Sequence, residues 1–479
     1  MSAAEPTRQY EPVIGIEIHV QLATRTKMFC GCELSFGEEP NTRTCPVCLA
    51  HPGVLPVTNA QAVHYGLMIG LALGCEIAPR SIFHRKNYFY PDSPKAYQIS
   101  QYDIPLCTSG RLGEVRIHRV HLEEDAAKLV HGGSSGRLHG AQWSIVDFNR
   151  CGTPLVEIVT EPDLRSAAEA ADFGRLLQAT LRRMGVSDVN MEEGSLRMDA
   201  NVSIRPKGQA AFGTKTELKN MNSFRFLERG IDAEIARQER ILAEGGTVEQ
   251  ETLHFDPQSG SLTSLRSKEE AHDYRYFPEP DLVPLAPTEE MVERARTALP
   301  ELPAARAERL ERELELPADT AKLLAFRSEL GDFYEAALAA DGAHARRLAN
   351  FVTNELTASI GDADPAATKL EPPVLARLVA MVADKEISAS AAREVLAVLI
   401  AEGGDPAAVV ESQGLGRAGE DELGDIVDRA IADNPDAVEK MRAGKGQAIG
   451  ALVGAVMRET KGRADGGEVQ RLIRERLGD

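Results

Sequence analysis

Apolar and polar residues alternate along "VIGIEIHVQL", residues 13–22 of the chain. One set of alternate positions is apolar: Ile14, Ile16, Ile18 and Val20. The other set carries Glu17, His19 and Gln21. Alternation of β-branched residues predicts a strand with one buried face. On its polar face Glu17 and His19 would lie side by side, about 7 Å apart at the backbone.

Two further stretches read as strands with polar groups on one face. "PLVEIVTE", residues 154–161, sets Glu157 within an apolar strand, and "LRMDANVSI", residues 196–204, presents Asp199 on its polar face. In "GTKTELKNMNSF" the polar face carries Glu217 between two lysines. Taken alone, each face is more typical of a solvated strand. Gathered over one sheet, such carboxylates would form an oxygen-rich site for Mg²⁺ and phosphates.

The pattern changes along the chain and predicts three domains. Residues 10–285 mix strand-like stretches with glycine and most of the aromatic residues. The proline-rich "FPEPDLVPLAPTEE", residues 277–290, marks a linker or domain edge, and helical periodicity follows it to the end. A second break falls at "AEGGDPAAV", residues 401–409. We therefore expect an α+β protein with a large mixed-sheet domain at 1–290, a helical domain at 291–404 and a small helical tail at 405–479.

Bulk composition limits the class of protein. Of 479 residues, 43% are hydrophobic and 27% are charged, as in ordinary soluble proteins. The longest apolar run is too short to span a bilayer, and the N-terminus has no apolar-cored leader. These features predict a cytoplasmic protein without a membrane span. The net charge of −19 disfavours a surface that is basic all over, although a local basic patch remains possible.

Four of the seven cysteines lie within "CGCELSFGEEPNTRTCPVC". Their spacing, C-x-C followed by C-x-x-C, is typical of a tetrahedral thiolate site, and zinc is its usual occupant. The predicted ligands are Cys30, Cys32, Cys45 and Cys48. Four protein ligands would make the site closed and structural. Reduced cysteines that serve as small apolar residues are the alternative.

Two kinds of motif limit how the chain could bind ATP or hydrolyse an amide. The chain has neither a G-x-x-x-x-G-K-[ST] loop nor a G-x-G-x-x-G fingerprint in a βαβ context, so any ATP binds on another structure. "GGSSG", residues 132–136, resembles part of a Ser-Ser-Lys amidase motif but continues as "RLHGAQW". We interpret it as a turn, which leaves no convincing amide-hydrolysing nucleophile.

The tail is polarised in charge. Residues 402–441 hold eleven acidic and three basic residues, whereas residues 442–463, "RAGKGQAIGALVGAVMRETKGR", hold five basic and one acidic. A basic, turn-rich segment on an acidic protein is a candidate contact for a phosphate backbone. By charge alone, a solvated face of mixed charge is the better interpretation.

Several long blocks of the chain resemble one known family. They include "IGIEIHVQL", "KMFCGCELSFGEEPNTRTCPVCLAHPGVLPVTN", "KNYFYPDSPKAYQISQYDIPL", "HLEEDAAK", "VDFNRCGTPLVEIVTEPDL", "TELKNMNSFRFLERGIDAEIARQ" and "RSKEEAHDYRYFPEPDL". In order, they span almost all of residues 11–285 and are similar to the GatB family, the B subunits of aspartyl/glutamyl-tRNA amidotransferases. "LVGAVMRETKGRA" resembles the tail motif shared with YqeY-like domains, although "DGGEVQRL" follows where the family has Asn-Pro.

The resemblance implies a cradle-like catalytic domain, a tRNA-binding tail and a two-step synthesis. Similar enzymes use ATP and Mg²⁺ to phosphorylate the side-chain carboxyl of Glu on misacylated tRNA(Gln), or of Asp on tRNA(Asn). Ammonia then displaces phosphate and leaves Gln or Asn on the tRNA. In that family a separate amidase subunit releases the ammonia from glutamine, and a small third subunit holds the heterotrimer together.

With this resemblance, specific residues acquire predicted roles. Glu17 and His19 would face a Mg²⁺/ATP site, and Glu124 is the next expected ligand, although either of its acidic neighbours is an alternative. The remaining candidates are Glu157, Asp199 and Glu217 in the catalytic shell, Lys128 and Arg150 for phosphate, and Arg458, Lys461 and Arg463 for tRNA.

Two alternatives stay open from the sequence. The related archaeal E subunit serves only Glu-tRNA(Gln), but those chains carry an extra domain before the helices, and here "FPEPDLVPL" runs directly into helices. The other is a non-catalytic, zinc-stabilised RNA-binding scaffold whose carboxylates are merely solvated. Which misacylated tRNA is the cellular substrate does not follow from the sequence.

Overall fold

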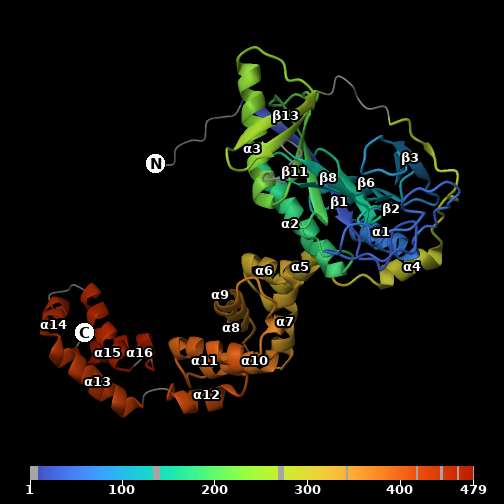
Figure 1. The fold of residues 1–479 in the computed structure, drawn as a ribbon. Helices are drawn as coiled ribbons and strands as arrows, with labels where there is room; N and C mark the ends of the chain where they lie inside the picture. The colour runs from blue at the N-terminus through green and yellow to red at the C-terminus, as the bar shows by residue number, and fades with distance from the viewer. Residues whose placement is uncertain are drawn as a thin grey trace. The chain divides into compact units, whose positions relative to one another are not determined.

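The structure is a computed structural model (Figure 1). It describes residues 9–132, 141–267, 274–340, 344–416, 419–442, 446–460 and 463–477. The chain forms two compact units, an N-terminal unit, Met1–Leu302, and a C-terminal unit, Pro303–Asp479. Among the helices of the described residues, none combines the length and apolar character needed to cross a bilayer.

A nine-stranded sheet organises the N-terminal unit. In spatial order its strands are β13 (Ser261–Ser267), β12 (Glu251–Asp256), β11 (Thr216–Met221), β10 (Leu196–Pro206), β1 (Tyr10–Gln21), β9 (Pro154–Thr160), β6 (Val115–Glu124), β5 (Cys107–Leu112) and β2 (Glu76–Ile77). Neighbouring strands are antiparallel except for the parallel pair β11 and β12. The predicted strand at 13–22 is therefore central to the sheet.

Two smaller sheets flank it. One has the order β14 (Phe277–Pro278), β3 (Phe83–Asn87) and β4 (Tyr97–Gln101), and the other pairs β7 (Lys128–Gly132) with β8 (Trp143–Asp147). The residues that form β14 lie nearly two hundred positions after β3 in the sequence, so the three-stranded sheet closes a long loop. Antiparallel pairing holds Phe277 opposite Arg85.

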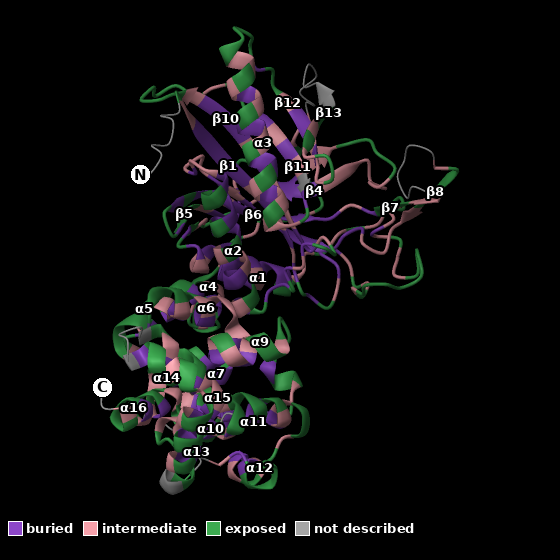
Figure 2. Cartoon of the chain, turned by 90° about the vertical axis from the view of Figure 1, so that its left-hand side faces the viewer, coloured by how far each residue is buried: buried purple, intermediate pink, exposed green. Residues whose placement is uncertain are grey.

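The apolar face of the large sheet carries the core of this unit. Ile14, Ile16, Ile18 and Val20 are all almost fully buried there. The described residues of the same unit also form the helices α1 (Ala60–Ala72), α2 (Ala167–Met184), α3 (Phe224–Ala243) and α4 (Glu289–Thr297). Their apolar residues join the sheet in one cluster, and Figure 2 shows β1 and β10 largely buried beside the amphipathic α3. Burial of one face leaves the other face for polar groups.

Local sequence fixes where two of these helices start and how closely they pack. Ser166 and Ser223 cap α2 and α3 by accepting hydrogen bonds from backbone N–H groups of the first turn. Gly174 of α2 faces Phe224 of α3, and a Cβ at this position would lie 2.8 Å from the Phe224 ring. The two helices therefore approach each other as only glycine permits.

The C-terminal unit is helical. Its helices are α5 (Pro303–Leu314), α6 (Ala318–Phe326), α7 (Ser328–Ala340), α8 (Ala345–Asn350), α9 (Thr357–Ile360), α10 (Pro372–Ala383), α11 (Ala389–Glu402), α12 (Pro406–Gln413), α13 (Glu420–Asp433), α14 (Pro435–Arg442), α15 (Ile449–Glu459) and α16 (Gly466–Leu477). A π-helical turn, Phe351–Leu356, links α8 to α9. A mixed-sheet unit followed by helices confirms the predicted α+β class.

The hydrophobic clusters divide the chain at points slightly different from the sequence-based boundaries. Ala295 of α4 is buried in the core of the N-terminal unit. Val410 of α12 belongs to a cluster that begins at Leu310, and a separate cluster runs from Leu423 to Ile473. Each core therefore takes in one helix beyond the boundaries expected at 290 and 404, α4 in the first case and α12 in the second.

Candidate functional site

Strand register aligns four polar residues in a row across the middle of the large sheet. His121 of β6 is opposite Glu157 of β9, Glu157 is opposite His19 of β1, and His19 is opposite Arg197 of β10. Residues directly opposite each other in antiparallel strands share a face. The polar side of "VIGIEIHVQL" therefore meets polar side chains from three other strands.

Two histidines and two glutamates of this face form what we call the His–Glu cluster: His19, His121, Glu123 and Glu157. His19 Nε2 lies 3.5 Å from Glu157 Oε2 and 3.7 Å from Glu123 Oε1. His121 Nε2 lies 3.2 Å from the same Glu157 oxygen. The glutamate side chains are 3% and 10% exposed, whereas that of His19 is 21% exposed. The cluster is thus a buried group that reaches solvent through His19.

Electrostatics within the cluster favour charged carboxylates. Burial raises the pKa of Glu157, but the charge and hydrogen bond of His121 outweigh burial and hold it well below its usual value. Burial lowers the pKa of His121, yet the nearby Glu157 and Glu123 raise it to about 9. The pKa of His19 is raised as well, since the Glu157 hydrogen bond and the Glu123 charge exceed the effect of burial. The charge of His121 thus stabilises the two buried carboxylates, and they in turn favour the protonated form of both imidazoles.

A divalent cation fits the same place. One nitrogen of His19 and one oxygen each of Glu123 and Glu157 lie within 4.8 Å of one another. Carboxylate oxygens suit Mg²⁺ and Mn²⁺, and imidazole is a less usual ligand of Mg²⁺. The cation would replace the positive charge that the imidazolium groups supply.

The cluster lines a cavity of about 510 Å³. Both His19 and Glu123 contribute to its wall. This volume is typical of small-molecule sites. The wall also carries cationic side chains from several elements: Lys86, Lys95, Arg197 and Lys219. Acidic groups beside cations suit an anionic, metal-bound ligand such as a nucleotide.

The three consecutive acidic residues of "HLEED" diverge. Glu123 shares the face of His121, because strand side chains alternate. Glu124 forms an ion pair with Lys95 and accepts a hydrogen bond of 3.0 Å from the Ile99 amide. It still lines the cavity but is not in the metal-capable group. The sequence had favoured Glu124 as the ligand, and the structure brings Glu123 to His19 instead.

Asp125 organises a further set of contacts. Its carboxylate lies 3.2 Å from the Arg197 guanidinium and accepts a hydrogen bond of 2.7 Å from the Gln21 amide. Burial raises its pKa, but the charges of Arg197 and Arg150 lower it overall. Arg150 itself donates to the Ala126 carbonyl at 2.9 Å. Arg150 is therefore engaged with the loop beneath the cavity.

Glu17, Asp199 and Glu217 lie on the polar face but form a second group. Glu17 accepts a hydrogen bond of 3.0 Å from the Asn201 side-chain amide. Lys219 Nζ lies 3.3 Å from Asp199 and 3.0 Å from Glu217. Burial lowers the pKa of Lys219, and the two carboxylates raise it overall. The sheet therefore brings all three predicted acids to one face, but none of them joins the metal-capable group of His19, Glu123 and Glu157.

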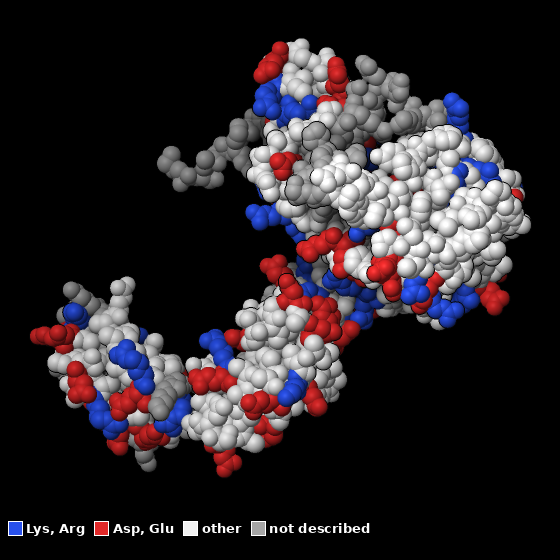
Figure 3. Space-filling model, viewed as in Figure 1, with Lys and Arg blue, Asp and Glu red and all other residues white. Residues whose placement is uncertain are grey.

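The predicted cations lie elsewhere. Lys128 is exposed at the start of β7 and is not among the residues that line the cavity. In the tail, Arg458 is exposed near the end of α15, and Arg463 pairs with Glu422 at 2.6 Å. Lys461 lies outside the described residues. Figure 3 shows acidic and basic side chains interspersed over the helices of this part of the chain.

Some site residues were missed in the sequence although a signal existed. In "HLEED" the alternation sets His121 and Glu123 on one face, which would have indicated the glutamate that lies beside His19. Lys86 and Lys95 carry no comparable signal, because Lys86 comes from β3 of a different sheet and Lys95 from the loop that follows it. Only tertiary packing brings them to the cavity wall.

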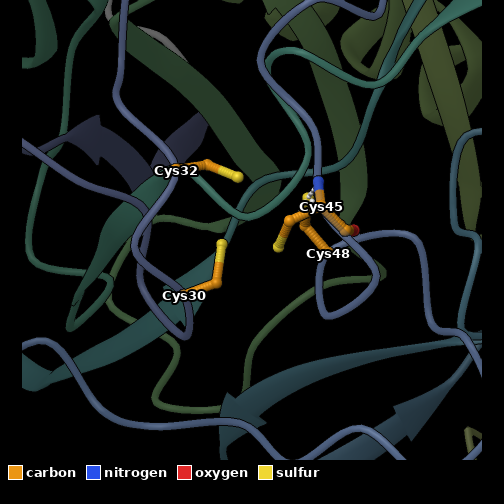
Figure 4. Close-up of side chains that lie close together, drawn as sticks. All are labelled: Cys30, Cys32, Cys45 and Cys48. Carbon is orange, nitrogen blue, oxygen red and sulfur yellow. Dashed lines mark hydrogen bonds between the residues drawn. The ribbon is translucent and has the colours of Figure 1, made fainter.

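The four predicted cysteine ligands converge (Figure 4). All four sulfur atoms lie within 4.8 Å of one another, and the Cys45 and Cys48 sulfurs are 3.9 Å apart. A tetrahedral zinc site with Zn–S bonds of about 2.3 Å requires sulfurs about 3.8 Å apart. A hydrogen bond with Cys30 lowers the pKa of Cys48 to about 4, so at least one thiolate is stable here. The cluster fits a zinc ion.

A buried lysine supports the thiolate character of this centre. Lys27 is 1% exposed, and its Nζ donates to the Phe148 carbonyl at 3.0 Å and to the Cys48 sulfur at 3.6 Å. Within the described ranges no carboxylate lies within ion-pair distance of it. A buried ammonium group requires a nearby anion. A zinc ion with four thiolates carries two negative charges, which Lys27 would partly offset.

Comparison with known proteins adds independent information. A family model described as the GatB/GatE catalytic domain matches residues 12–293, and one described as the GatB domain matches residues 332–477. The chain is 50% identical to the aspartyl/glutamyl-tRNA(Asn/Gln) amidotransferase B subunit of Thermobifida fusca, over 99% of this chain and 95% of that one. It is 51% identical to the B subunit from Frankia casuarinae, over 100% and 97% of the two chains.

The His–Glu cluster predicts a proton-linked metal affinity. A cation must displace the protons of imidazolium groups, so we expect Mn²⁺ to bind more tightly as pH rises toward about 9, the pKa of His121. Calorimetry of the zinc-saturated protein in buffers of different ionisation enthalpy should detect released protons. A His121→Gln variant should release fewer, and binding without proton release would contradict this account.

The thiolate centre predicts a role for Lys27. Replacement of Lys27 by Met keeps its bulk but removes its charge, so zinc should be lost to a chelator about ten times faster. The exposed Lys207→Met variant should match the wild type, and Cys45→Ser should hold no zinc. Zinc release can be followed with a chromogenic chelator. Equal release rates for Lys27→Met and wild type would exclude a role of this charge.

Proposed function

The chain belongs to the GatB family, and from that membership we propose that it forms the transamidating subunit of a tRNA-dependent amidotransferase. Its substrates would be Glu-tRNA(Gln), Asp-tRNA(Asn) or both. It would use ATP and Mg²⁺ to activate the side-chain carboxyl and ammonia to form Gln-tRNA(Gln) or Asn-tRNA(Asn). Its partners in a cytoplasmic heterotrimer would be an amidase subunit and a small third subunit. The enzyme would be a carbon–nitrogen ligase with glutamine as amido donor.

The chemistry requires two steps because a carboxylate has no usable leaving group. In the first, a side-chain carboxylate oxygen attacks the γ-phosphorus of ATP, and ADP leaves. In the second, ammonia attacks the carbonyl carbon, and the C–O bond to phosphate breaks. The released phosphate takes up the proton that the nitrogen loses. Both steps develop negative charge on phosphate oxygens, which cations must stabilise.

The observation that carries this proposal is the buried His–Glu cluster at the wall of a cavity rich in cations. His19, Glu123 and Glu157 would hold the Mg²⁺, which when bound neutralises phosphate oxygens. Lys86 and Lys95 would bind the phosphates of the nucleotide. Arg197, held by Asp125, would keep its guanidinium directed at the same cavity.

The second acidic group has a supporting role in this scheme. Asp199 and Glu217 would hold Lys219 in the cavity wall, where its ammonium group would meet a phosphate, and Glu17 would hold the neighbouring Asn201. Glu124 would orient Lys95 in the same way. Arg150 would act through Asp125 and not directly on phosphate.

The remaining parts of the chain serve binding and stability. The cysteine centre would hold a structural zinc ion, because four protein ligands leave no open position for a substrate. The exposed Arg458 and its neighbours in the tail would contact the phosphate backbone of tRNA. Ammonia would come from the amidase partner.

A reaction driven by ammonium chloride tests the catalytic assignment without the glutaminase. The chain, purified with its amidase and small-subunit partners, is supplied with Glu-tRNA(Gln) or Asp-tRNA(Asn), ATP and Mg²⁺, and amide formation on the tRNA is followed. We expect Glu157→Gln to lower kcat at least about 100-fold, because it removes a ligand charge at the reacting phosphates. Glu161→Gln, a surface residue just after β9, is the matched control and should keep wild-type activity.

Other outcomes are equally informative. Undiminished activity of Glu157→Gln would keep the reaction but remove the His–Glu cluster from it. Loss in Glu17→Gln but not in Glu157→Gln would move the metal site to the second acidic group. No amide formation by the wild type with either tRNA would favour a zinc-stabilised RNA-binding scaffold without catalysis.

A further inference from the structure

A row of neighbouring tyrosine rings lines part of the cavity and is exposed at both of its ends. We call it the tyrosine row: Tyr90, Tyr88, Tyr274, Tyr276 and Tyr102, in spatial order. Successive ring centroids along it are 5.8, 6.5, 6.1 and 4.3 Å apart. Tyr88 and Tyr274 line the cavity. Two inner rings of the row therefore lie where a bound substrate would lie, and the rings at both ends, Tyr90 and Tyr102, are exposed.

The row comes from three segments that the small sheet gathers. Tyr88 follows β3, Tyr102 follows β4, and residues 274–276 precede β14. Asn87 joins two of them, since its side-chain amide donates to the Tyr274 and Arg275 carbonyls at 3.1 and 2.8 Å. The rings are thus held by hydrogen-bonded backbone beside the cavity.

The outer rings are exposed to an unusual extent. Tyr90 is 42% and Tyr102 is 56% exposed, and the neighbouring Phe89 is 85% exposed. Five of the chain's nine tyrosines belong to the row. Scattered exposed aromatics need no explanation, but a connected set at the rim of a cavity marks a binding surface. Rings with a polar hydroxyl suit a flat, partly polar ligand.

The surroundings of the row favour contact with bases over contact with phosphates. Arg85 of β3 is bound to both oxygens of Glu279 at 2.7 Å and stacks over Tyr97. In the view of Figure 3 the surface over β3 shows few charged side chains. A backbone-binding groove would carry cations along its whole length. Here Lys86 Nζ lies 4.8 Å from the Tyr274 ring centroid, at the part of the row that lines the cavity, where it would serve the phosphates in the cavity. Stacking on aromatic rings does not depend on charge.

We propose that the tyrosine row stacks the unpaired 3′-terminal bases of the aminoacylated RNA, so that the amino acid on the last ribose enters the cavity. This inference rests on the proposed function, in which the ester-linked amino acid reaches the His–Glu cluster. The terminal adenine would then stack beside Tyr88 and Tyr274, the rings that line the cavity, and its ribose would carry the amino acid inward. The bases before it extend over Tyr276 and Tyr102.

An adenine base has two possible sources, the RNA terminus and ATP. The length of the row decides between them. One nucleotide needs one or two rings, whereas this row continues past the cavity to Tyr102, which does not line it. A strand of several unpaired bases uses the whole row.

The experiment uses the chain purified with its partner subunits and two fluorescent probes. One is full-length deacylated tRNA with 2-aminopurine in place of its terminal adenine, and the other is 2-aminopurine riboside triphosphate. Stacking on a ring quenches 2-aminopurine. We expect quenching of the RNA probe by wild type and by Tyr102→Phe and Tyr274→Phe. Tyr274→Leu should abolish the quenching, since leucine keeps apolar area but offers no ring.

Kinetics supply the second measurement. In the ammonium-driven reaction, Tyr102→Leu should raise the KM for aminoacyl-tRNA about tenfold, which corresponds to about 1.4 kcal/mol, with the KM for ATP unchanged. Tyr102→Phe should restore the wild-type value. Phe212→Leu removes an exposed ring far from the row in the sequence and is the matched control, expected to change neither constant.

The outcomes separate the inference from the proposed function. Quenching of only the nucleotide probe, or a raised KM for ATP, would assign the rings to ATP and overturn the inference. Loss of a partner protein during purification of the leucine variants would make the row a protein interface and overturn it as well. If wild type forms the amide but the leucine variants behave normally, the row fails and the reaction stands. If wild type is inactive but quenches in the expected pattern, the reaction fails and the stacking stands.

Discussion

The polar face of the N-terminal unit is arranged around two buried glutamates, which require positive charge close to them. Removing a carboxylate from water costs several kcal/mol unless positive charge accompanies it. Glu123 and Glu157 meet this requirement through His19 and His121 across three adjacent strands. The same need recurs at Asp125 with Arg197 and at Glu217 with Lys219. These acidic groups of the polar face are therefore each paired with a positively charged side chain. A bound cation would replace one of these positive charges.

This arrangement depends on rigidity, which the opposite face of the same sheet supplies. Residues such as Ile18 and Ile158 alternate with the site residues and are completely buried. A slip of one residue in strand pairing would exchange the two faces, which burial of the apolar set prevents. Site residues on packed central strands keep their distances better than residues on loops. The stability of the core and the geometry of the site are thus two results of one alternating pattern.

Peripheral elements complete the cavity and determine what reaches it. The three-stranded sheet contributes Lys86 and the inner tyrosines, and the nearby loop contributes Lys95. The cysteine centre lies beside a smaller cavity that Lys95 and Glu124 also line. Metal binding at the cysteines would therefore stabilise one wall next to the site without taking part in its chemistry. Catalysis, zinc binding and RNA recognition would occupy adjoining parts of one unit.

The amino-acid sequence by itself determined the α+β class, the strand at 13–22 with its two faces, and the group of four cysteines, because each depends on local periodicity or close spacing. It did not determine which acids share a site. Glu17 and His19 are two residues apart, yet they belong to different groups, because each is paired with what the neighbouring strands present. The sequence favoured Glu124 because it does not reveal the strand register that brings Glu123 to His19. It offered Lys128 for phosphate because it does not reveal the packing that brings Lys86 and Lys95 to the cavity. Pairing of β1 with β9 and with β10 joins residues more than a hundred positions apart, and only the folded chain decides that register.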